Sequence, residues 1–409
     1  MRVNNNMIAD QMLFNIQSTS EKLGRLQTSL SSGKKFERPS DDPVNVNRVM
    51  RLTEQTNKEK QYLTSLQTMA PVLQMTDSSL QDISGLVSNA QVQIKQAQNA
   101  TNSDSMAQIA GNLDQIISTI LTAANTTYNG HYLFGGFNVN EKPFVLENEK
   151  IRYNGTDDVV SVQVTDTDTS DLGIKGNDLF VTHSVQGNFI SNTKEYLLPG
   201  LTTNSFNLTV GSNNPVTISV GTGTGDVTLQ KVADAINSSG AEVKAYIKST
   251  TGGYKLKLVS NFVGNDGEIT IQDSVAGGVM EKLGMIDNAS NIVGEQSDIN
   301  NSLLDNLMVI RDKINAGDTG FDTEATLVQS GFKNVLRNLG RIGVMTQSVE
   351  NRQQMMSDIA IKREELLASV QDIDYAQVAM QLNKEMMAYQ AAIQSGAKVV
   401  MPSLLDYLR

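Results

Sequence analysis

The chain has 409 residues, a formal net charge of −11 at pH 7 and no cysteine. The length allows two or three domains. The acidic balance argues against a nucleic-acid partner, because phosphate binding depends on clustered Lys and Arg, and the lack of cysteine excludes disulfides, thiolate catalysis and sulfur-ligated metals. No apolar run approaches the ~18 residues of a membrane helix, and the amino end lacks the apolar core of a secretory signal.

The amino end predicts a long amphipathic helix from about Met7 to Leu30. Its apolar residues recur at steps of three and four, the spacing that places side chains on one helix face. Gly33 can adopt the left-handed conformation that ends a helix. The residues expected on the apolar face are Ile16, Leu23, Leu26 and Leu30.

A turn is predicted directly after this helix, made of Arg38, Pro39, Ser40, Asp41, Asp42 and Pro43. Asp42 suits the N-cap of a second helix, with Pro43 at the first helical position. A pair of acid and base carboxylates at Asp41 and Asp42 is a weaker interpretation than a cap, because both lie at a helix start. We therefore interpret this turn as a domain junction.

Two further helices are predicted next. Leu73, Leu80, Val87 and Ile94 keep a seven-residue spacing, and Pro71 is expected to kink or interrupt their helix. After a break at 101–104, apolar residues from 109 to 120 predict another helix.

From Tyr128 the sequence becomes rich in Gly, Thr, Val and Asn, with short alternating runs typical of strands. We expect strands at 216–220, 243–247, 254–259 and 268–271 and one short helix at 229–236. Residues 171–294 are thus predicted to form a compact β-rich domain with one helix.

Helical spacing returns at Leu303 and extends to the carboxyl end. Two series of apolar residues repeat every seven positions. The first is Val328, Val335, Ile342, Val349 and Met356, and the second is Ile359, Leu366, Ile373, Met380 and Met387. A period near 3.5 is the pattern of helices that bury one seam in a coiled coil. Because both ends carry it, we expect the termini to meet in space and the middle of the chain to be inserted between them.

We found no group of residues that indicates catalysis, a cofactor or a metal. His131 and His183 are interpreted as turn or surface residues. Asp157, Asp158 and the acidic stretch 166–171 lack the calcium-loop pattern and are expected in solvated loops. Residues 221–225 have the glycines of a phosphate loop without its Lys. We therefore predict a protein that is not an enzyme, with no cofactor.

Several motifs of this sequence resemble the flagellin family. At the amino end these are Met7 to Leu30, Ser32-Gly33-Lys34-Lys35 and Arg38 to Pro43, followed by Tyr132 to Phe137 and Lys142-Pro143-Phe144. At the carboxyl end they are Asp374-Tyr375-Ala376, Gln381-Leu382-Asn383, Tyr389 to Ala392 and Ser403 to Leu408. Together they are similar to the FlgL-type branch, the hook-associated proteins of the hook–filament junction.

The resemblance implies an elongated, multidomain α+β fold. Its expected parts are a terminal coiled-coil domain of 1–40 with 368–409, a helical bundle with a β-hairpin of 41–170 with 295–367, and the inserted β-rich outer domain 171–294. It also implies a structural adaptor that joins a neighbouring hook-associated protein to flagellin, with copies of itself as further partners. Such proteins are extracellular, exported through the flagellar type III apparatus without a cleaved signal peptide, and a cytosolic flagellar export chaperone is expected to mask the carboxyl-terminal helix.

We expect the assembly interface to consist of the apolar terminal residues. These are Ile16, Leu23, Leu26, Leu30, Leu366, Ile373, Met380, Met387, Leu404 and Leu405. Our hypothesis is that they are unpaired or disordered in a single chain and become ordered when copies stack, because one exposed seam cannot offset its chain entropy.

Two alternatives remain open: a flagellin filament subunit, and an extracellular hydrolase carried on a helical stalk. The hydrolase would need a His-Glu-x-x-His or comparable cluster in 171–294, where the sequence has none.

Overall fold

The computed structural model describes residues 5–36, 38–100, 102–180, 182–221, 223–296 and 302–407. It divides into two compact units. The terminal unit contains the chain up to Thr64 and from Gln353 onward, and the central unit is Ser65–Arg352. The α+β fold class is confirmed. The predicted division into three domains stays a prediction, and neither unit boundary coincides with the positions it proposed.

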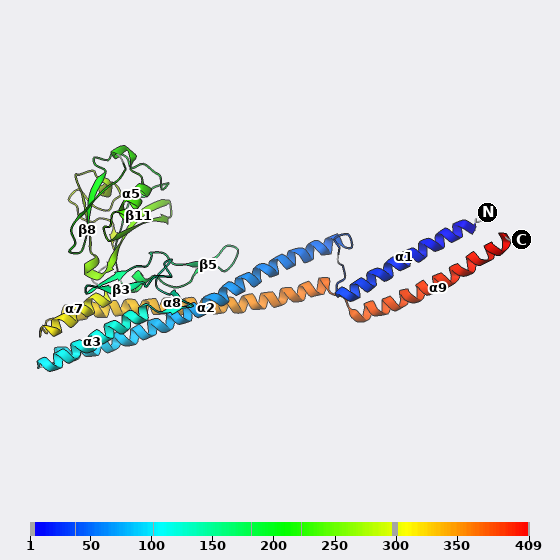
Figure 1. Ribbon diagram of the computed structural model, residues 1–409, viewed down its shortest axis with the longest axis horizontal. Helices are drawn as coiled ribbons and strands as arrows, with labels where there is room; N and C mark the ends of the chain where they lie inside the picture. The colour runs from blue at the N-terminus through cyan, green and yellow to red at the C-terminus, as the bar shows by residue number, and fades with distance from the viewer. Residues whose placement is uncertain are drawn as a thin grey trace. The chain divides into compact units, whose positions relative to one another are not determined.

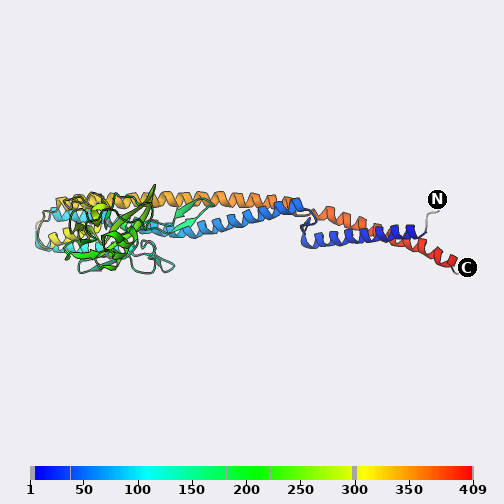
Figure 2. The ribbon, with the colours of Figure 1, turned by 90° about the horizontal axis from the view of Figure 1, so that it is seen from above.

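The terminal unit is built of helices from both ends of the sequence. α1 (Asn5–Ser32) and α9 (Tyr375–Tyr407) lie side by side in both views (Figures 1 and 2). The unit also contains the first part of α2 (Pro43–Gln98) and the last part of α8 (Asp322–Gln371), which are joined by an ion pair of 2.7 Å between Glu59 and Arg363. The α1–α9 contact and the Glu59–Arg363 ion pair show that the two ends of the chain lie together, as the sequence predicts.

The central unit contains the rest of α2 and α8 together with α3 (Ser103–Ala124) and α7 (Leu303–Asn315). The residues of the predicted seven-residue repeats are fully buried or nearly so, as the heptad pattern requires. They are Leu73, Leu80, Val87, Ile94, Val328, Val335, Ile342 and Val349.

α2 continues without a break through Pro71, so the predicted interruption there is wrong. A proline inside a helix removes one backbone hydrogen bond and crowds the preceding turn. The side chains on either side, Met69 and Leu73, are completely buried. We attribute the continuity to this packing, because tertiary burial outweighs the local cost of one missing hydrogen bond.

The β-rich part of the central unit contains antiparallel sheets. A six-stranded sheet has the order β13-β7-β11-β4-β3, with β10 also paired to β11, and a three-stranded sheet has the order β12-β8-β9. Their strands are β3 (Phe144–Glu147), β4 (Lys150–Tyr153), β7 (Thr182–Gln186), β8 (Ser205–Val210), β9 (Val216–Ser219), β10 (Val243–Thr250), β11 (Gly253–Val263), β12 (Ile269–Asp273) and β13 (Glu295–Gln296).

α5 (Leu229–Ser238) packs on β10 and closes the core of this part (Figure 1). Thr228 caps the helix, since its side-chain oxygen accepts a hydrogen bond from the Lys231 backbone N–H at 3.2 Å. The predicted helix at 229–236 and the predicted strands are therefore confirmed within a few residues. The structure adds two four-residue helices, α4 (Gly176–Leu179) and α6 (Val279–Lys282).

The central unit also contains two small hairpins: β1 (Thr127–Tyr128) with β2 (His131–Tyr132), and β5 (Ser161–Gln163) with β6 (Thr169–Asp171). The β5–β6 hairpin is fixed to α8 by ion pairs. Arg352 contacts Asp168 at 2.7 Å, and Arg341 contacts Asp171 at 3.9 Å.

Asp157 is a buried carboxylate, which corrects the expectation of a solvated loop. Its side chain is 1% exposed and contacts the ammonium groups of Lys175 at 3.3 Å, Lys248 at 3.0 Å and Lys257 at 2.9 Å. Burial alone would raise the pKa of Asp157, but the Lys257 charge and the hydrogen bonds from Asn177 and Lys257 hold that pKa far below its usual range. The lysines come from β10, β11 and the start of α4, so one carboxylate ties the loop after β4 to the large sheet.

The Asp157→Asn variant is expected to lose about 3 kcal/mol or more of unfolding free energy, because three ammonium groups would lose their buried counter-charge. Asp158→Asn is the matched control, since the side chain of Asp158 is 48% exposed and its ion pair with Lys248 is worth little. Urea titration followed by circular dichroism measures both. Equal effects of the two substitutions would contradict this account of the buried charge.

His183 is also buried, contrary to the surface position expected for it. It lies on β7, where its Nδ1 accepts a hydrogen bond of 2.6 Å from the backbone N–H of Ile269 at the start of β12. Nε2 faces the Gln296 side-chain oxygen at 3.4 Å on β13. The neutral ring thus connects two sheets, and its burial lowers the pKa of His183 despite the raising effects of Gln296 and Glu268.

Unfolding is expected to become easier as the pH falls below about 6.5, the ordinary pKa of histidine. The folded-state pKa is lowered, so the unfolded chain binds a proton more readily and stability is lost on acidification. Thermal melts at pH 7.5 and 5.5 should show a larger loss for the unmodified chain than for His183→Gln. An equal loss in both proteins would mean that His183 is not responsible.

Candidate assembly surface

The α1–α9 pair is held by residues on one side of each helix. Half-buried residues of α1 include Met12, Ile16, Leu23, Leu26 and Leu30, which matches the predicted apolar face. The half-buried residues of α9 are Val378, Ala379, Leu382, Glu385, Tyr389 and Ala392. Their spacing of three and four positions is that of a single helix face.

Two of the residues predicted for the seam of α9, Met380 and Met387, therefore do not face α1 in this pair, and their place in an interface between copies stays a prediction. Met380 and Met387 are 67% and 64% exposed and point away from α1. Leu382 and Tyr389 lie seven residues apart, as Met380 and Met387 do. The seven-residue period therefore fits two different faces of α9. Aromatic Tyr389 and branched Leu382 fill the seam, while the flexible methionines stay outside it.

Among the described side chains, Lys384 is the one ionisable group on the outer face of α9. The exposed members of this face are Ala376, Met380, Asn383, Lys384, Met387, Gln390, Ala391 and Gln394. On α1, Leu13 and Phe14 are also exposed, Phe14 by 66%. Large apolar side chains that are exposed together on one surface are typical of a surface that another protein covers. We call the exposed residues of the outer face of α9 the α9 outer stripe.

The hypothesis that the terminal segments are unpaired in a single chain does not agree with the structure. Both are helices, and each buries one side against the other. One apolar side of each helix is covered by the other helix of the same chain, whereas the α9 outer stripe stays exposed. Leu404 and Leu405 lie in α9, but their side chains are outside the described residues.

Ile373 lies in the loop between α8 and α9, not on a continuous helical stripe, which corrects the predicted repeat there. Its backbone N–H donates to the Gly33 carbonyl at 3.0 Å, and its side chain is only 9% exposed. Asp374 begins the next helix, since its side chain accepts from the backbone N–H of Ala376 at 3.0 Å and of Gln377 at 3.2 Å. Leu366, on α8, is 41% exposed.

The loop after α1 pairs with this same loop. The Lys35 backbone N–H donates to the Gln371 carbonyl at 2.7 Å, and the Lys35 ammonium donates to the Ser369 carbonyl at 2.9 Å. Phe36 is buried at this point. Residues 33–36 and 369–373, more than 330 positions apart in sequence, thereby form one junction.

The predicted junction turn adopts the capped conformation that its sequence indicates. The backbone N–H of Arg38 donates to the Asp41 side chain at 3.0 Å, and α2 begins two residues after Asp41, at Pro43. Asp42 accepts a hydrogen bond of 3.0 Å from the Asn45 backbone N–H. That bond, with a second one from the Asn45 side chain, lowers the pKa of Asp42.

Among the described residues, no helix is long and apolar enough to cross a membrane. In the same part of the chain, no group of three or more His, Asp or Glu side chains is placed to hold a metal ion.

Residues 3–139 match the family model described as the bacterial flagellin N-terminal helical region. Over 182 residues, the chain is 28% identical to flagellar hook-associated protein 3 of Escherichia coli strain K12, and to the same protein of Salmonella typhimurium strain LT2. The alignment covers 44% of this chain and 57% of each relative, so the chain spans little more than half of the length of the curated relatives it matches.

Among solved structures, the chain is similar to flagellar hook-associated protein-3 of Legionella pneumophila, with a TM-score of 0.47 and 13% identity over 79% of this chain and 98% of that one. A hook-associated protein of Vibrio parahaemolyticus, described as putative in its own report, gives a TM-score of 0.46 and 12% identity over 81% of this chain and 100% of that one.

The Gly33→Ala variant is expected to destabilise the terminal unit by about 1–2 kcal/mol. Gly33 has a φ of +72°, and a Cβ there would lie 2.6 Å from the Tyr375 hydroxyl oxygen. Gly24→Ala is the matched control, because Gly24 lies inside α1 with open space at its Cβ position, and helix propensity predicts a gain of up to ~1 kcal/mol. Thermal unfolding followed by circular dichroism distinguishes the two signs, and a stabilised Gly33→Ala would contradict the assigned junction.

Proposed function

We propose that this protein is a structural adaptor of the bacterial flagellum, located at the hook–filament junction between a neighbouring hook-associated protein and flagellin. The observation that carries the proposal is the homology to flagellar hook-associated protein 3, which favours the junction role over that of a flagellin filament subunit. The α9 outer stripe supports it, because a subunit of an assembly needs a surface that only neighbouring molecules cover.

Assembly would use the apolar terminal residues that the single chain leaves exposed. Met380 and Met387 are the most exposed large apolar side chains among the described residues of α9, and each would contribute roughly 1.5–3 kcal/mol when covered by another helix. The half-buried residues Leu23, Leu26 and Leu30 can bury further area against neighbouring copies. The proposal includes the predicted interface of apolar terminal residues and the predicted division into a terminal coiled-coil domain, a helical bundle with a β-hairpin and a β-rich outer domain.

The proposed partners are copies of the same chain, flagellin and a neighbouring hook-associated protein. Before export, a cytosolic chaperone would cover α9, since a methionine-rich apolar stripe is prone to non-specific association. The proposed location is extracellular, in the flagellum, reached through the type III apparatus without a cleaved signal peptide. Because the homologues are structural flagellar proteins, we propose no enzymatic activity.

The adaptor role can be measured on hooks isolated from the source bacterium after deletion of the gene for this chain. These hooks are expected to carry the neighbouring hook-associated protein and to elongate flagellin filaments only after the purified chain is added. Elongation without the chain would contradict the adaptor role. Long filaments formed by the purified chain alone would favour the flagellin alternative.

Met380→Asp is expected to abolish binding to these hooks while leaving the helical content unchanged, because the side chain is 67% exposed in the single chain. Val275→Asp is the matched control, since Val275 is 54% exposed in the β-rich part of the central unit. Bound protein is measured by co-sedimentation and elongation by electron microscopy. Normal binding of Met380→Asp would remove the α9 outer stripe from the assembly interface.

A further inference from the structure

Methionine thioethers are the side chains of this protein that mild oxidants attack first. The sequence has seventeen methionines and neither cysteine nor tryptophan. A peroxide converts an accessible thioether into a sulfoxide, which replaces a flexible apolar side chain by a polar, chiral one. The exposed fractions of the methionines therefore predict which of them react while the chain is folded.

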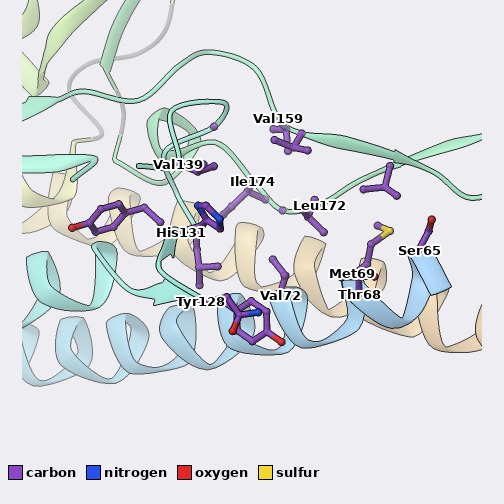
Figure 3. A pocket seen from close by; sticks show the side chains of 17 residues that line it. Ser65, Thr68, Met69, Val72, Tyr128, His131, Val139, Val159, Leu172 and Ile174 are labelled. Carbon is purple, nitrogen blue, oxygen red and sulfur yellow. The ribbon is translucent and has the colours of Figure 1, made fainter. Parts of the chain in front are cut away.

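Several methionines of the central unit are shielded by the fold. Met69, Met280 and Met285 have no exposed surface. Figure 3 shows Met69 and Val72 of α2 at the wall of an apolar groove, and even there the Met69 side chain is completely buried. These three methionines are internal reference sites, because a peroxide in solution does not reach them.

The α9 outer stripe carries two methionines that are not shielded. Met380 and Met387 are 67% and 64% exposed and lie seven residues apart, on one face of α9. Asn383 and Lys384 occupy positions three and four residues from each of them, and residues at this spacing are neighbours on a helix surface. Their amide and ammonium groups are hydrogen-bond donors, so a sulfoxide oxygen at either methionine has donors nearby on the solvent-exposed face.

We propose that Met380 and Met387 are oxidation sites that decide whether the α9 outer stripe binds neighbouring molecules. The oxidant is a peroxide. A lone pair of the methionine sulfur attacks one peroxide oxygen, the O–O bond breaks and, with hydrogen peroxide, the products are the sulfoxide and one molecule of water. The sulfur loses two electrons, which the peroxide gains. This inference rests on the proposed function, because it requires that assembly covers the stripe.

Oxidation opposes assembly because it changes the free energy of burying the stripe. A thioether is stabilised when apolar neighbours cover it, whereas a buried sulfoxide oxygen loses its hydrogen bonds to water. The stripe is exposed on the single chain and would be covered after assembly. Oxidation thus excludes unassembled copies, assembled copies are protected, and enzymatic reduction of the sulfoxides reverses the exclusion.

The test is a modification-interference experiment on the full chain. Purified protein is treated with hydrogen peroxide until its exposed methionines are partly oxidised, and is then mixed in excess with the isolated hooks. Oxidised and unoxidised copies compete for the same sites, and mass spectrometry of the sedimented and free fractions gives the sulfoxide content at each methionine. Met50 of α2 and Met355 of α8, 62% and 49% exposed, are the matched controls outside the α9 outer stripe.

The bound fraction is expected to contain roughly tenfold less sulfoxide at Met380 and at Met387 than the free fraction, since burial of one methionine side chain corresponds to about a tenfold change in affinity or more. At Met50 and Met355 the two fractions are expected to have equal sulfoxide content. The buried reference methionines are expected to stay unoxidised in both fractions.

A second measurement uses the same oxidised protein after treatment with methionine sulfoxide reductases A and B, which together reduce both epimers of the sulfoxide. Hook binding is expected to return to the level of the untreated chain. Circular dichroism is expected to show the same helical content before and after oxidation, because Met380 and Met387 face solvent in the single chain. A loss of helix on oxidation would attribute weaker binding to unfolding and overturn the proposal.

Hooks that bind the untreated chain, yet take up copies with sulfoxide at Met380 and Met387 as readily as unoxidised copies, would overturn the oxidation control and leave the adaptor role standing. Equal depletion at Met50 and Met355 would also overturn it, because the effect would not belong to the α9 outer stripe. Failure of the untreated chain to bind the hooks at all would overturn the adaptor role and, with it, the oxidation control.

Discussion

The terminal unit depends on one backbone pairing between distant parts of the sequence. The segment after α1 hydrogen-bonds to the segment between α8 and α9, through Lys35 with Gln371 and Ile373 with Gly33. Gly33 supplies the left-handed turn that this crossing needs. Because the pairing fixes where α1 ends and where α9 begins, it decides which side of each helix meets the other and which side stays exposed.

The exposed side is chemically distinct from an ordinary helix surface. Solvent-facing helix positions usually carry charged or polar residues, whereas the α9 outer stripe has amides, alanines and two methionines beside a single lysine, Lys384. Uncharged polar groups allow close approach of copies without strong repulsion, and methionine adapts its shape to the neighbour it meets.

The β-rich part of the central unit has an apolar core, and buried polar groups connect its sheets in addition. Asp157 gathers three lysines, and His183 connects β7 with β12 and β13. Removing one partner from such a group is costly, since the remaining charges or hydrogen-bonding groups stay buried without compensation. These interactions fix the β-rich part independently of the apolar seams that hold the helices.

The sequence by itself determined the helices, their caps and the order of helical and β-rich regions, since heptad spacing, Gly33 and Asp42 act through local geometry. It also identified the terminal segments that pair. Only the tertiary structure decided that Leu382 and Tyr389 face α1 while Met380 and Met387 face outward, because two overlapping stripes satisfy the same period. It likewise decided that Ile373 leaves the helix and that Asp157 and His183 are buried. Their partners come from strands up to 113 residues away, and a linear pattern carries no information about such encounters.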